Sequence, residues 1–331
     1  MTATILVVVE HDRGTLAAAS REAMAAARRA AAESDAADDI AALTIGAKAD
    51  GLADELIALG ADAVLQAHHD VLADYGPEAW GEVVVQAVAM VRPSLVLASG
   101  TDRGNEVLAQ AGARLDVPMV ANCAMWAANG DGGLDVTRVR WGGSLLEEAT
   151  VSAPVLLVSV AVHSIDGATT NPSDRGEVSV FEPELDPTLA RSVVRDRVER
   201  VAGITLATAP VVVGGGRGVG SADGFAPLQE LAGLLGGVVG CSRAVTNNGW
   251  RNHTDQVGQT GTRIAPTVYL ACGISGAIQH WVGAMAAKNI IAINTDPEAN
   301  MVQKAGYAVI GDLHEVVPAI SAEIRRRRGE R

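Results

Sequence analysis

Three segments near the C-terminus carry the strongest pattern in the chain: Gln256-Val257-Gly258-Gln259-Thr260-Gly261, then Cys272-Gly273-Ile274-Ser275-Gly276-Ala277-Ile278-Gln279-His280, and then Ala292-Ile293-Asn294. The first segment is a loop of small residues, the second follows a strand and carries a Gly/Ser turn that opens a helix, and the third is a strand that ends in Asn. A glycine-rich turn at the start of a helix suits phosphate groups because backbone N–H groups can approach them closely. The stretch therefore predicts a nucleotide clamp.

Outward from this stretch, β-branched apolar runs alternate with helical patterns along the whole chain. In the second half, strands are expected at 210–213, 238–241, 267–271, 290–294 and 308–310, with helices at 225–235, 275–287 and from Asp312 onward. In the first half, strands are expected at 5–9, 39–45, 63–66, 95–98, 134–141 and 153–162, with helices at 15–32, 52–59, 78–91 and from about residue 101 to 115, where Thr101 or Asp102 is the expected N-cap. The alternation predicts an α/β fold with mostly parallel sheets flanked by helices.

The chain is expected to divide into two domains, because 331 residues exceed one typical core. Gly, Pro, Asp and Thr dominate 166–192, so we interpret that stretch as the edge of the first domain and a linker. The predicted domains are 1–190 and 191–331. The second is Rossmann-like.

The net charge and the cysteines limit the classes of function that the chain can have. A formal charge of -13 argues against nucleic-acid binding, which needs a basic face, and favours partners with basic patches. The three cysteines are widely separated and show no metal-ligand spacing, so no metal site is expected. The chain has neither a cleavable leader pattern at its first residues nor an apolar run of bilayer length. We therefore expect a cytoplasmic protein that is not embedded in a membrane.

Two sites in the second domain combine glycine or serine with arginine. The run from Val213 to Gly220 contains Arg217 between a strand and a helix, but Val219 stands where the dinucleotide fingerprint needs its last Gly. A plain βα turn remains open there, although Arg217 suits a pyrophosphate. Ser242 and Arg243 follow a buried strand, where ligands bind in open α/β sheets. Arg243 is then either a solvated charge or a partly desolvated cation that favours reduced, anionic forms of a redox ring.

The remaining candidates are polar residues with ordinary structural alternatives. Gln259 and Thr260 offer an amide and a hydroxyl, or form a simple polar turn. The turn around Ser275 superficially matches a nucleophile elbow, but Ala277 replaces its last Gly, so a hydrolase is disfavoured. Gln279 and His280 are placed to reach the same ligand as that turn. Asn294 and Asp312 could contact a ribose or phosphate, or could serve as cap and turn residues.

Taken together, these elements resemble the flavin-binding half of the electron transfer flavoprotein alpha subunit, the family also called FixB. Five separated elements appear in the family's order between about Val211 and Pro318, and the N-terminal half agrees in general pattern and length. The resemblance implies one FAD held by the second domain. The residues expected to line it are Arg217, Ser242, Arg243, Val257, Gly258, Gln259, Thr260, Ser275, Gly276, Ala277, Ile278, Gln279, His280, Asn294, Asp312 and Leu313.

The resemblance also implies residue roles and partners. Arg243 would lie against the isoalloxazine ring, Thr260 near its N5 and His280, cationic or hydrogen-bonding, near its C2 carbonyl; these three would tune the redox chemistry. The first domain would contact a beta subunit that carries AMP, giving a heterodimer. Such a protein is an electron carrier rather than an enzyme with its own substrate. It would take electrons from acyl-CoA or other dehydrogenases, as in fatty acid β-oxidation, and pass them to an acceptor such as a membrane quinone oxidoreductase.

Two alternatives stay open at this point. One is an electron-bifurcating version that uses NADH, and the other is a non-redox nucleotide-binding module. The sequence also departs from the family pattern at four places, namely Cys272, Ala299-Asn300, Gly306-Tyr307 and the stretch 250–255.

Overall fold

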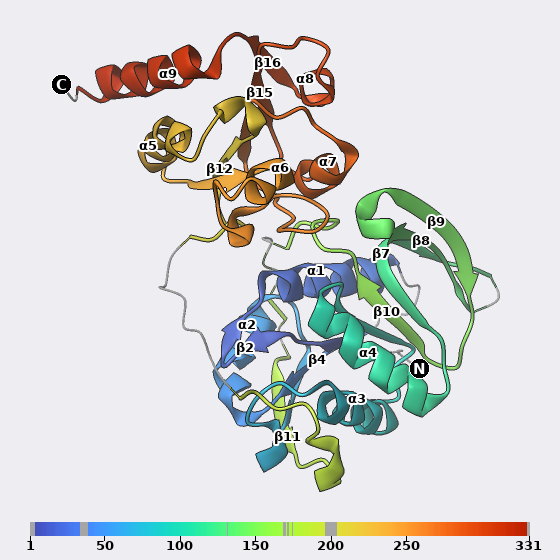
Figure 1. Cartoon of the computed structure of the whole chain (residues 1–331). Coiled ribbons are helices and arrows are strands. Elements are labelled where there is room, and N and C mark those ends of the chain that lie inside the picture. The colour runs from blue at the N-terminus through green and yellow to red at the C-terminus, as the bar shows by residue number, and fades with distance from the viewer. Residues whose placement is uncertain are drawn as a thin grey trace. The chain divides into compact units, whose positions relative to one another are not determined.

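The chain forms two compact units in the computed structural model (Figure 1). The structure describes residues 4–33, 39–130, 132–167, 170, 172–173, 175–195 and 204–329. One unit consists of Met1–Arg140 and Leu145–Val198, and the other of Trp141–Ser144 and Glu199–Arg331. The domain limit between residues 190 and 191 and the contact of the first domain with a beta subunit stay predictions.

The first unit is built on a nine-stranded sheet with the order β11-β5-β4-β1-β6-β10-β7-β8-β9. The strands are β1 (Thr4–Val8), β4 (Asp39–Ile45), β5 (Ala63–Ala67), β6 (Leu95–Ser99), β7 (Met119–Ala128), β8 (Leu134–Arg140), β9 (Leu145–Val151), β10 (Leu156–Val160) and β11 (Glu177–Phe181). The pairs from β11 to β7 are parallel, whereas β7, β8 and β9 pair antiparallel. The short strands β2 (His11–Asp12) and β3 (Thr15–Leu16) pair separately.

Helices cover both faces of this sheet. The helices α1 (Ala18–Glu33) and α2 (Ala53–Ala58) contribute Met24 and Leu56 to the apolar cluster on one face. The helices α3 (Pro77–Val91) and α4 (Asp102–Leu115) contribute Trp80 and Leu108 to the cluster on the other. A strand buried on both faces needs apolar residues throughout, which is why these strands are continuous apolar runs rather than alternating ones.

Three strands of the nine-stranded sheet are absent from the sequence prediction. β9 alternates between half-buried and exposed residues and β7 mixes buried, half-buried and exposed ones, because both lie in the antiparallel extension of the sheet, where one face meets solvent. β11 falls inside the stretch interpreted as a linker, and it is the edge strand beside β5. The linker interpretation is therefore wrong at 177–181. Thr101, in contrast, is the N-cap of α4, since its hydroxyl accepts a hydrogen bond from the Gly104 N–H at 3.0 Å.

The second unit is a five-stranded, wholly parallel sheet with the order β13-β12-β14-β15-β16. Its strands are β12 (Val211–Gly215), β13 (Val238–Cys241), β14 (Val268–Cys272), β15 (Ile290–Asn294) and β16 (Tyr307–Ile310). In chain order this is the 2-1-3-4-5 arrangement of a doubly wound fold, in which the strand order reverses between β12 and β14. The predicted α/β class, with two mostly parallel sheets, is confirmed.

Helices again lie on both faces of the sheet. On one side, α5 (Ala226–Leu234) and α9 (Leu313–Arg328) pack Leu228 and Val317 against the strands. On the other lie α7 (Ile278–Ala284), α8 (Asn300–Lys304) and the 256–264 loop, while α6 (Arg243–Asn247) follows β13. The helix expected from Ser275 to about Ala287 is shorter than predicted. It begins at Ile278, because Ser275 to Ala277 form a turn in which Gly276 has a φ of 77°.

Candidate functional site

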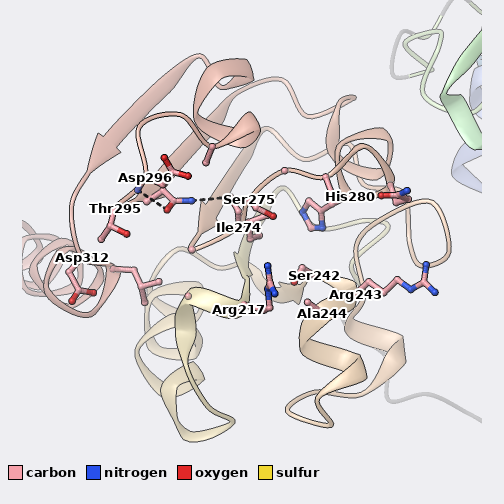
Figure 2. Close-up of a pocket in the computed structure, with 18 of the residues that line it drawn as sticks. Arg217, Ser242, Arg243, Ala244, Ile274, Ser275, His280, Thr295, Asp296 and Asp312 are labelled. Atoms are coloured by element: carbon pink, nitrogen blue, oxygen red, sulfur yellow. Dashed lines mark hydrogen bonds between the residues drawn. The ribbon is translucent and has the colours of Figure 1, made fainter.

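A pocket of about 480 Å³ lies at the carboxyl ends of all five strands of the second unit (Figure 2). Each strand is followed by residues that line it: Arg217 after β12, Ser242 after β13, Ser275 after β14, Asp296 after β15 and Asp312 after β16. Ligands of open α/β sheets bind outside the carboxyl ends of the strands, where the strand order reverses. The volume lies in the range of ligand pockets, about 300 to 1,000 Å³.

The glycine-rich turn after β12 approaches the turn after β14 closely. A Cβ on Gly218 would lie 2.8 Å from the Cα of Gly273, and Gly273 has a φ of 63°. The Gly218 N–H donates to the Gly273 carbonyl at 3.2 Å. These contacts leave a pocket wall without side chains, which a ligand can approach closely, while the N–H groups of Gly218 and Gly273 both donate within the protein. The glycines therefore do more than make a flexible turn.

The two arginines of the pocket are exposed in this chain. Within the described part of the chain, neither Arg217 nor Arg243 has an ion-pair or hydrogen-bond partner, whereas Arg251 binds Asp255 at 2.8 Å. The expectation that the apolar run before Arg243 partly desolvates it is wrong for the chain by itself. The reason is that Arg243 begins the short helix α6 at the surface rather than ending a buried strand. Both cations remain open to a ligand.

His280 is the buried polar residue of the pocket. Its side chain is 6% exposed, and its Nε2 lies 2.7 Å from the hydroxyl of Tyr269 on β14. Burial lowers the pKa of His280 to about 4, and a contact with the Val257 backbone, which acts in the opposite direction, does not reach hydrogen-bond geometry. The imidazole is therefore neutral at neutral pH. Of the two forms that the sequence left open, the neutral, hydrogen-bonding one is therefore favoured over the cation in this chain.

The Gln256–Gly261 loop lies beside α7 and not among the residues that line the pocket. The Gln259 N–H donates to the Gln279 carbonyl at 2.7 Å, and a Cβ on Gly258 would lie 2.9 Å from the same oxygen. The Thr260 hydroxyl accepts from Gln256 Nε2 at 2.9 Å. The loop is thus fixed against the helix that carries His280, with Thr260 exposed at its tip.

The ends of β15 and β16 supply the remaining polar groups. Asn294 Nδ2 donates to the Ile274 carbonyl at 3.1 Å, and Asn294 Oδ1 accepts from the Asp296 N–H at 3.1 Å. Asp312 caps α9, since its carboxylate accepts from the His314 N–H at 2.9 Å. The structural alternatives weighed for Asn294 and Asp312 therefore hold, and both residues also line the pocket.

The pocket brings together most of the predicted residues but not all of them. Those that line it are Arg217, Ser242, Arg243, Ser275, Gly276, Ala277, Gln279, His280, Asn294, Asp312 and Leu313, whereas Val257, Gly258, Gln259, Thr260 and Ile278 do not. Residues that the sequence prediction missed are Gly218, Ala244, Asn247, Gly273, Ile274, Thr295, Asp296, Ala299 and Gly311. Most of them directly follow a strand or adjoin a predicted residue. The rule that carboxyl-end loops line the ligand could have found them.

Two departures from the family pattern have structural explanations. Cys272 is fully buried in β14, and burial raises the pKa of its thiol to about 12, so the group is an inert core residue. In the 250–255 stretch, Trp250 packs against the apolar cluster beneath α5, and the Arg251 guanidinium lies 5.5 Å from the ring centre of Phe225. Neither departure disturbs the pocket.

The described residues contain no group of three or more His, Cys, Asp or Glu side chains that could hold a metal ion. Nor is any helix in the described part of the chain long and apolar enough to cross a membrane.

Comparison with known proteins identifies both halves of the chain. The family model of the electron transfer flavoprotein domain matches residues 5–186, and that of the electron transfer flavoprotein FAD-binding domain matches residues 205–285. The electron transfer flavoprotein subunit alpha of Bacillus subtilis is 33% identical over 97% of each chain. That of Mycobacterium tuberculosis is 33% identical over 99% of this chain and all of its own, and the FixB protein of Bradyrhizobium diazoefficiens is 34% identical over 98% of this chain and 89% of its own.

Proposed function

Because the chain belongs to the electron transfer flavoprotein alpha-subunit family, we propose that it holds one FAD in the pocket of its second unit and carries electrons between other proteins. The FAD supplies the redox chemistry when bound, and the chain positions it and tunes its environment. The protein is then an electron carrier and has no substrate of its own.

The observation that carries this proposal is the combination of groups at the carboxyl ends of the strands. Two guanidinium groups without carboxylate partners among the described residues, Arg217 and Arg243, share the pocket with the buried, neutral His280. The Nδ1 atom of His280 is buried and has no hydrogen-bond partner in the described structure. A dinucleotide with negative phosphates and a ring rich in acceptor oxygens satisfies all three groups.

Different residues along the pocket suit different parts of the FAD. The charge of Arg217 suits the pyrophosphate, and the lack of side chains at Gly218 and Gly273 lets that group approach closely. Asn294 and Asp312 suit the adenosine end. Arg243 and His280 suit the flavin ring, where a cation and a neutral donor favour its negatively charged reduced forms. The remaining predicted contacts, from Val257 to Thr260, require the loop beside α7 to face the ring.

The partners in this proposal follow from the family. A beta subunit that carries AMP completes a cytoplasmic heterodimer, with the first unit of this chain contacting it. Acyl-CoA or other dehydrogenases reduce the FAD, and a membrane quinone oxidoreductase reoxidises it. The acidic charge of -13 supports docking to partners with basic patches.

Co-expression of the chain with its beta subunit tests the proposal. We expect a yellow heterodimer that contains one FAD per pair in this chain's pocket and can be reduced and reoxidised. Gly218→Leu forces the turn after β12 away from Gly273 on the pocket wall and should release the flavin, whereas Gly233→Ala, in α5 with open space around it, should not. A colourless heterodimer that takes up no added FAD would instead indicate a non-redox module.

A further inference from the structure

Tyr269 is a buried residue that lines no part of the pocket and is absent from the predicted flavin contacts. It lies on β14, with its side chain fully enclosed between the sheet and α7. Its hydroxyl lies 2.7 Å from His280 Nε2, and the two rings stack with centres 6.1 Å apart. The pair therefore joins the core of the second unit to the pocket.

Hydrogen-bond counting decides which of the two atoms donates. His280 is the one hydrogen-bond partner recorded for the Tyr269 hydroxyl in the described chain. If Nε2 carried the proton and donated it to Tyr269, the hydroxyl hydrogen would be buried without an acceptor, which costs about 1–3 kcal/mol. If the hydroxyl donates to Nε2, only the hydrogen on Nδ1 is left without a partner, whereas the other arrangement leaves both the hydroxyl hydrogen and the Nδ1 lone pair unsatisfied. Burial raises the pKa of Tyr269 well above its ordinary range, so the hydroxyl keeps the proton that this bond needs.

The consequence appears at the other nitrogen of the ring. A neutral imidazole carries one proton, so an Nε2 that accepts leaves the proton on Nδ1. Nδ1 is buried and unpartnered in the described structure, and His280 lines the pocket. In Figure 2 the ring of His280 extends from α7 toward the middle of the residues drawn. A buried N–H without a partner at a pocket wall is a donor that a ligand's acceptor oxygen would satisfy.

We propose that Tyr269 is a positioning residue that holds His280 as the neutral Nδ1–H tautomer, so that His280 donates a hydrogen bond to an acceptor oxygen of the ligand in this pocket. The inference rests on the proposed FAD site for the identity of that ligand. The assignment of the tautomer does not depend on it, since it follows from the protein's own contacts.

The lack of a side chain at Gly214, the first glycine of the glycine-rich run, leaves space for the Tyr269 hydroxyl. A Cβ on Gly214, in β12, would lie 2.6 Å from Cε2 of Tyr269 and closer still to its hydroxyl oxygen. Because β12 and β14 are paired neighbours, any side chain at this position would push the hydroxyl away from His280. Gly214 is thus required by the Tyr269 side chain rather than by a phosphate.

Nuclear magnetic resonance of the full-length chain, in complex with its beta subunit and labelled with ¹⁵N at histidine, tests the proposal. Two-bond ¹H–¹⁵N correlations distinguish the two neutral tautomers and the cation, and His280→Gln identifies the His280 signal. At neutral pH we expect the Nδ1–H tautomer in both the flavin-depleted and the FAD-loaded complex. An Nε2–H tautomer or a charged ring in the depleted complex would overturn the proposal.

The variant Tyr269→Phe measures the effect on the ligand. It keeps the ring in place and removes the donor, so the His280 signal should lose its Nδ1–H pattern and the Kd for FAD should rise about tenfold, the effect of one buried hydrogen bond. Tyr307→Phe, at an exposed position of the edge strand β16, should change neither. An unaltered tautomer and an unaltered Kd in Tyr269→Phe would reject the positioning role.

The proposed function and the proposed role of Tyr269 can be rejected independently of each other. If the complex binds no FAD but shows the Nδ1–H tautomer, the proposed function is wrong and the role of Tyr269 stands for a different ligand. If Tyr269→Phe does not fold, the tautomer in the unmodified complex still decides the question.

Discussion

At the scale of single residues, burial rather than residue type decides what His280 can do. A histidine near neutral pH can carry a charge or act as a neutral donor, and its position in the sequence leaves both open. The structure encloses the ring between β14 and α7, where the neutral form is favoured. The partner that orients it, Tyr269, is eleven positions earlier on another element, so no local pattern reveals the pair.

The depressed pKa of His280 gives the stability a defined pH dependence. Between about pH 4 and 6.5 the unfolded chain binds a proton at this position that the folded chain does not, so the free energy of unfolding rises with pH across that window and is level above it. The contribution has a slope of about 1.4 kcal/mol per pH unit. His280→Gln should remove it, which denaturant unfolding at pH 5 and pH 7 would measure. His11 has a pKa lowered by burial and adds a slope of the same sign, so the comparison with the unmodified chain isolates His280.

The matched control for that experiment is His314→Gln, on the exposed first turn of α9. It should leave the pH dependence as it is. An identical slope in His280→Gln and the unmodified chain would mean that the ring is not held neutral.

Arg243→Ala should lower the reduction potential of the bound flavin. Loss of the cation destabilises the negative charge of the reduced ring by about 1–2 kcal/mol, a value between those for a charge pair in water and one near a protein surface. Lys288→Ala removes a positive charge from an exposed site of the same unit that does not line the pocket, and should have little effect. A reductive titration of both variants measures the difference, and equal potentials would reject the role of Arg243.

At the scale of elements, close backbone approaches explain the glycines that the sequence concentrates in the second unit. Gly258 and Gly283 bring the 256–261 loop against α7, and a Cβ on Gly283 would overlap the Gly258 backbone. Gly218 and Gly273 bring the turns after β12 and β14 together. The dinucleotide fingerprint fails at Val219 because that side chain is buried in the apolar cluster with Leu228 and Val317.

Gly214→Ala should destabilise the second unit. The added methyl group overlaps the Tyr269 ring inside a packed core, which costs about 1–3 kcal/mol. Gly233→Ala, in the last turn of α5 with nothing within 4 Å of the added Cβ, should instead stabilise the protein, by at most about 0.5–1 kcal/mol. Thermal unfolding of the two variants provides the measurement. A Gly214→Ala protein as stable as the unmodified one would contradict the packing derived for Tyr269.

The strands that the prediction missed have a common physical cause. β7 and β9 belong, with the predicted strand β8, to an antiparallel extension, where many residues are half-buried or exposed and the pattern is weaker than the apolar runs of β1 or β6. β11 is an edge strand whose exposed residues include charged and polar ones. Burial on both faces, which produces the continuous apolar signal, is lacking in each of these strands.

At the scale of the whole molecule, two separate cores support two units. The clusters around Met24 and Trp80 belong to the first unit, and those around Leu228 and Tyr269 to the second. The resemblance to the electron transfer flavoprotein alpha subunit is confirmed by family models that match each half of the chain. The large first unit, which makes up more than half of the chain, does not contribute to the candidate pocket.

We expect FAD to stabilise the second unit selectively. A ligand that binds only the folded state adds about 2.7 kcal/mol at a hundredfold excess over its Kd. Hydrogen exchange with and without FAD should therefore slow in peptides that cover β12 to α9 and remain unchanged in the core strands β1, β4 and β6. Equal protection in both units would mean that the flavin site is not confined to the pocket described.

The fold class, the alternation of strands and helices and the family could all be predicted from the sequence, because buried parallel strands and glycine-rich turns leave strong local patterns. Only the tertiary structure decided the state of His280, the exposure of Arg243 and the position of the 256–261 loop beside the pocket. Those properties depend on desolvation and on contacts between residues far apart in the chain. Tyr269 and Gly214, which belong to different strands, affect the pocket only after the sheet has formed.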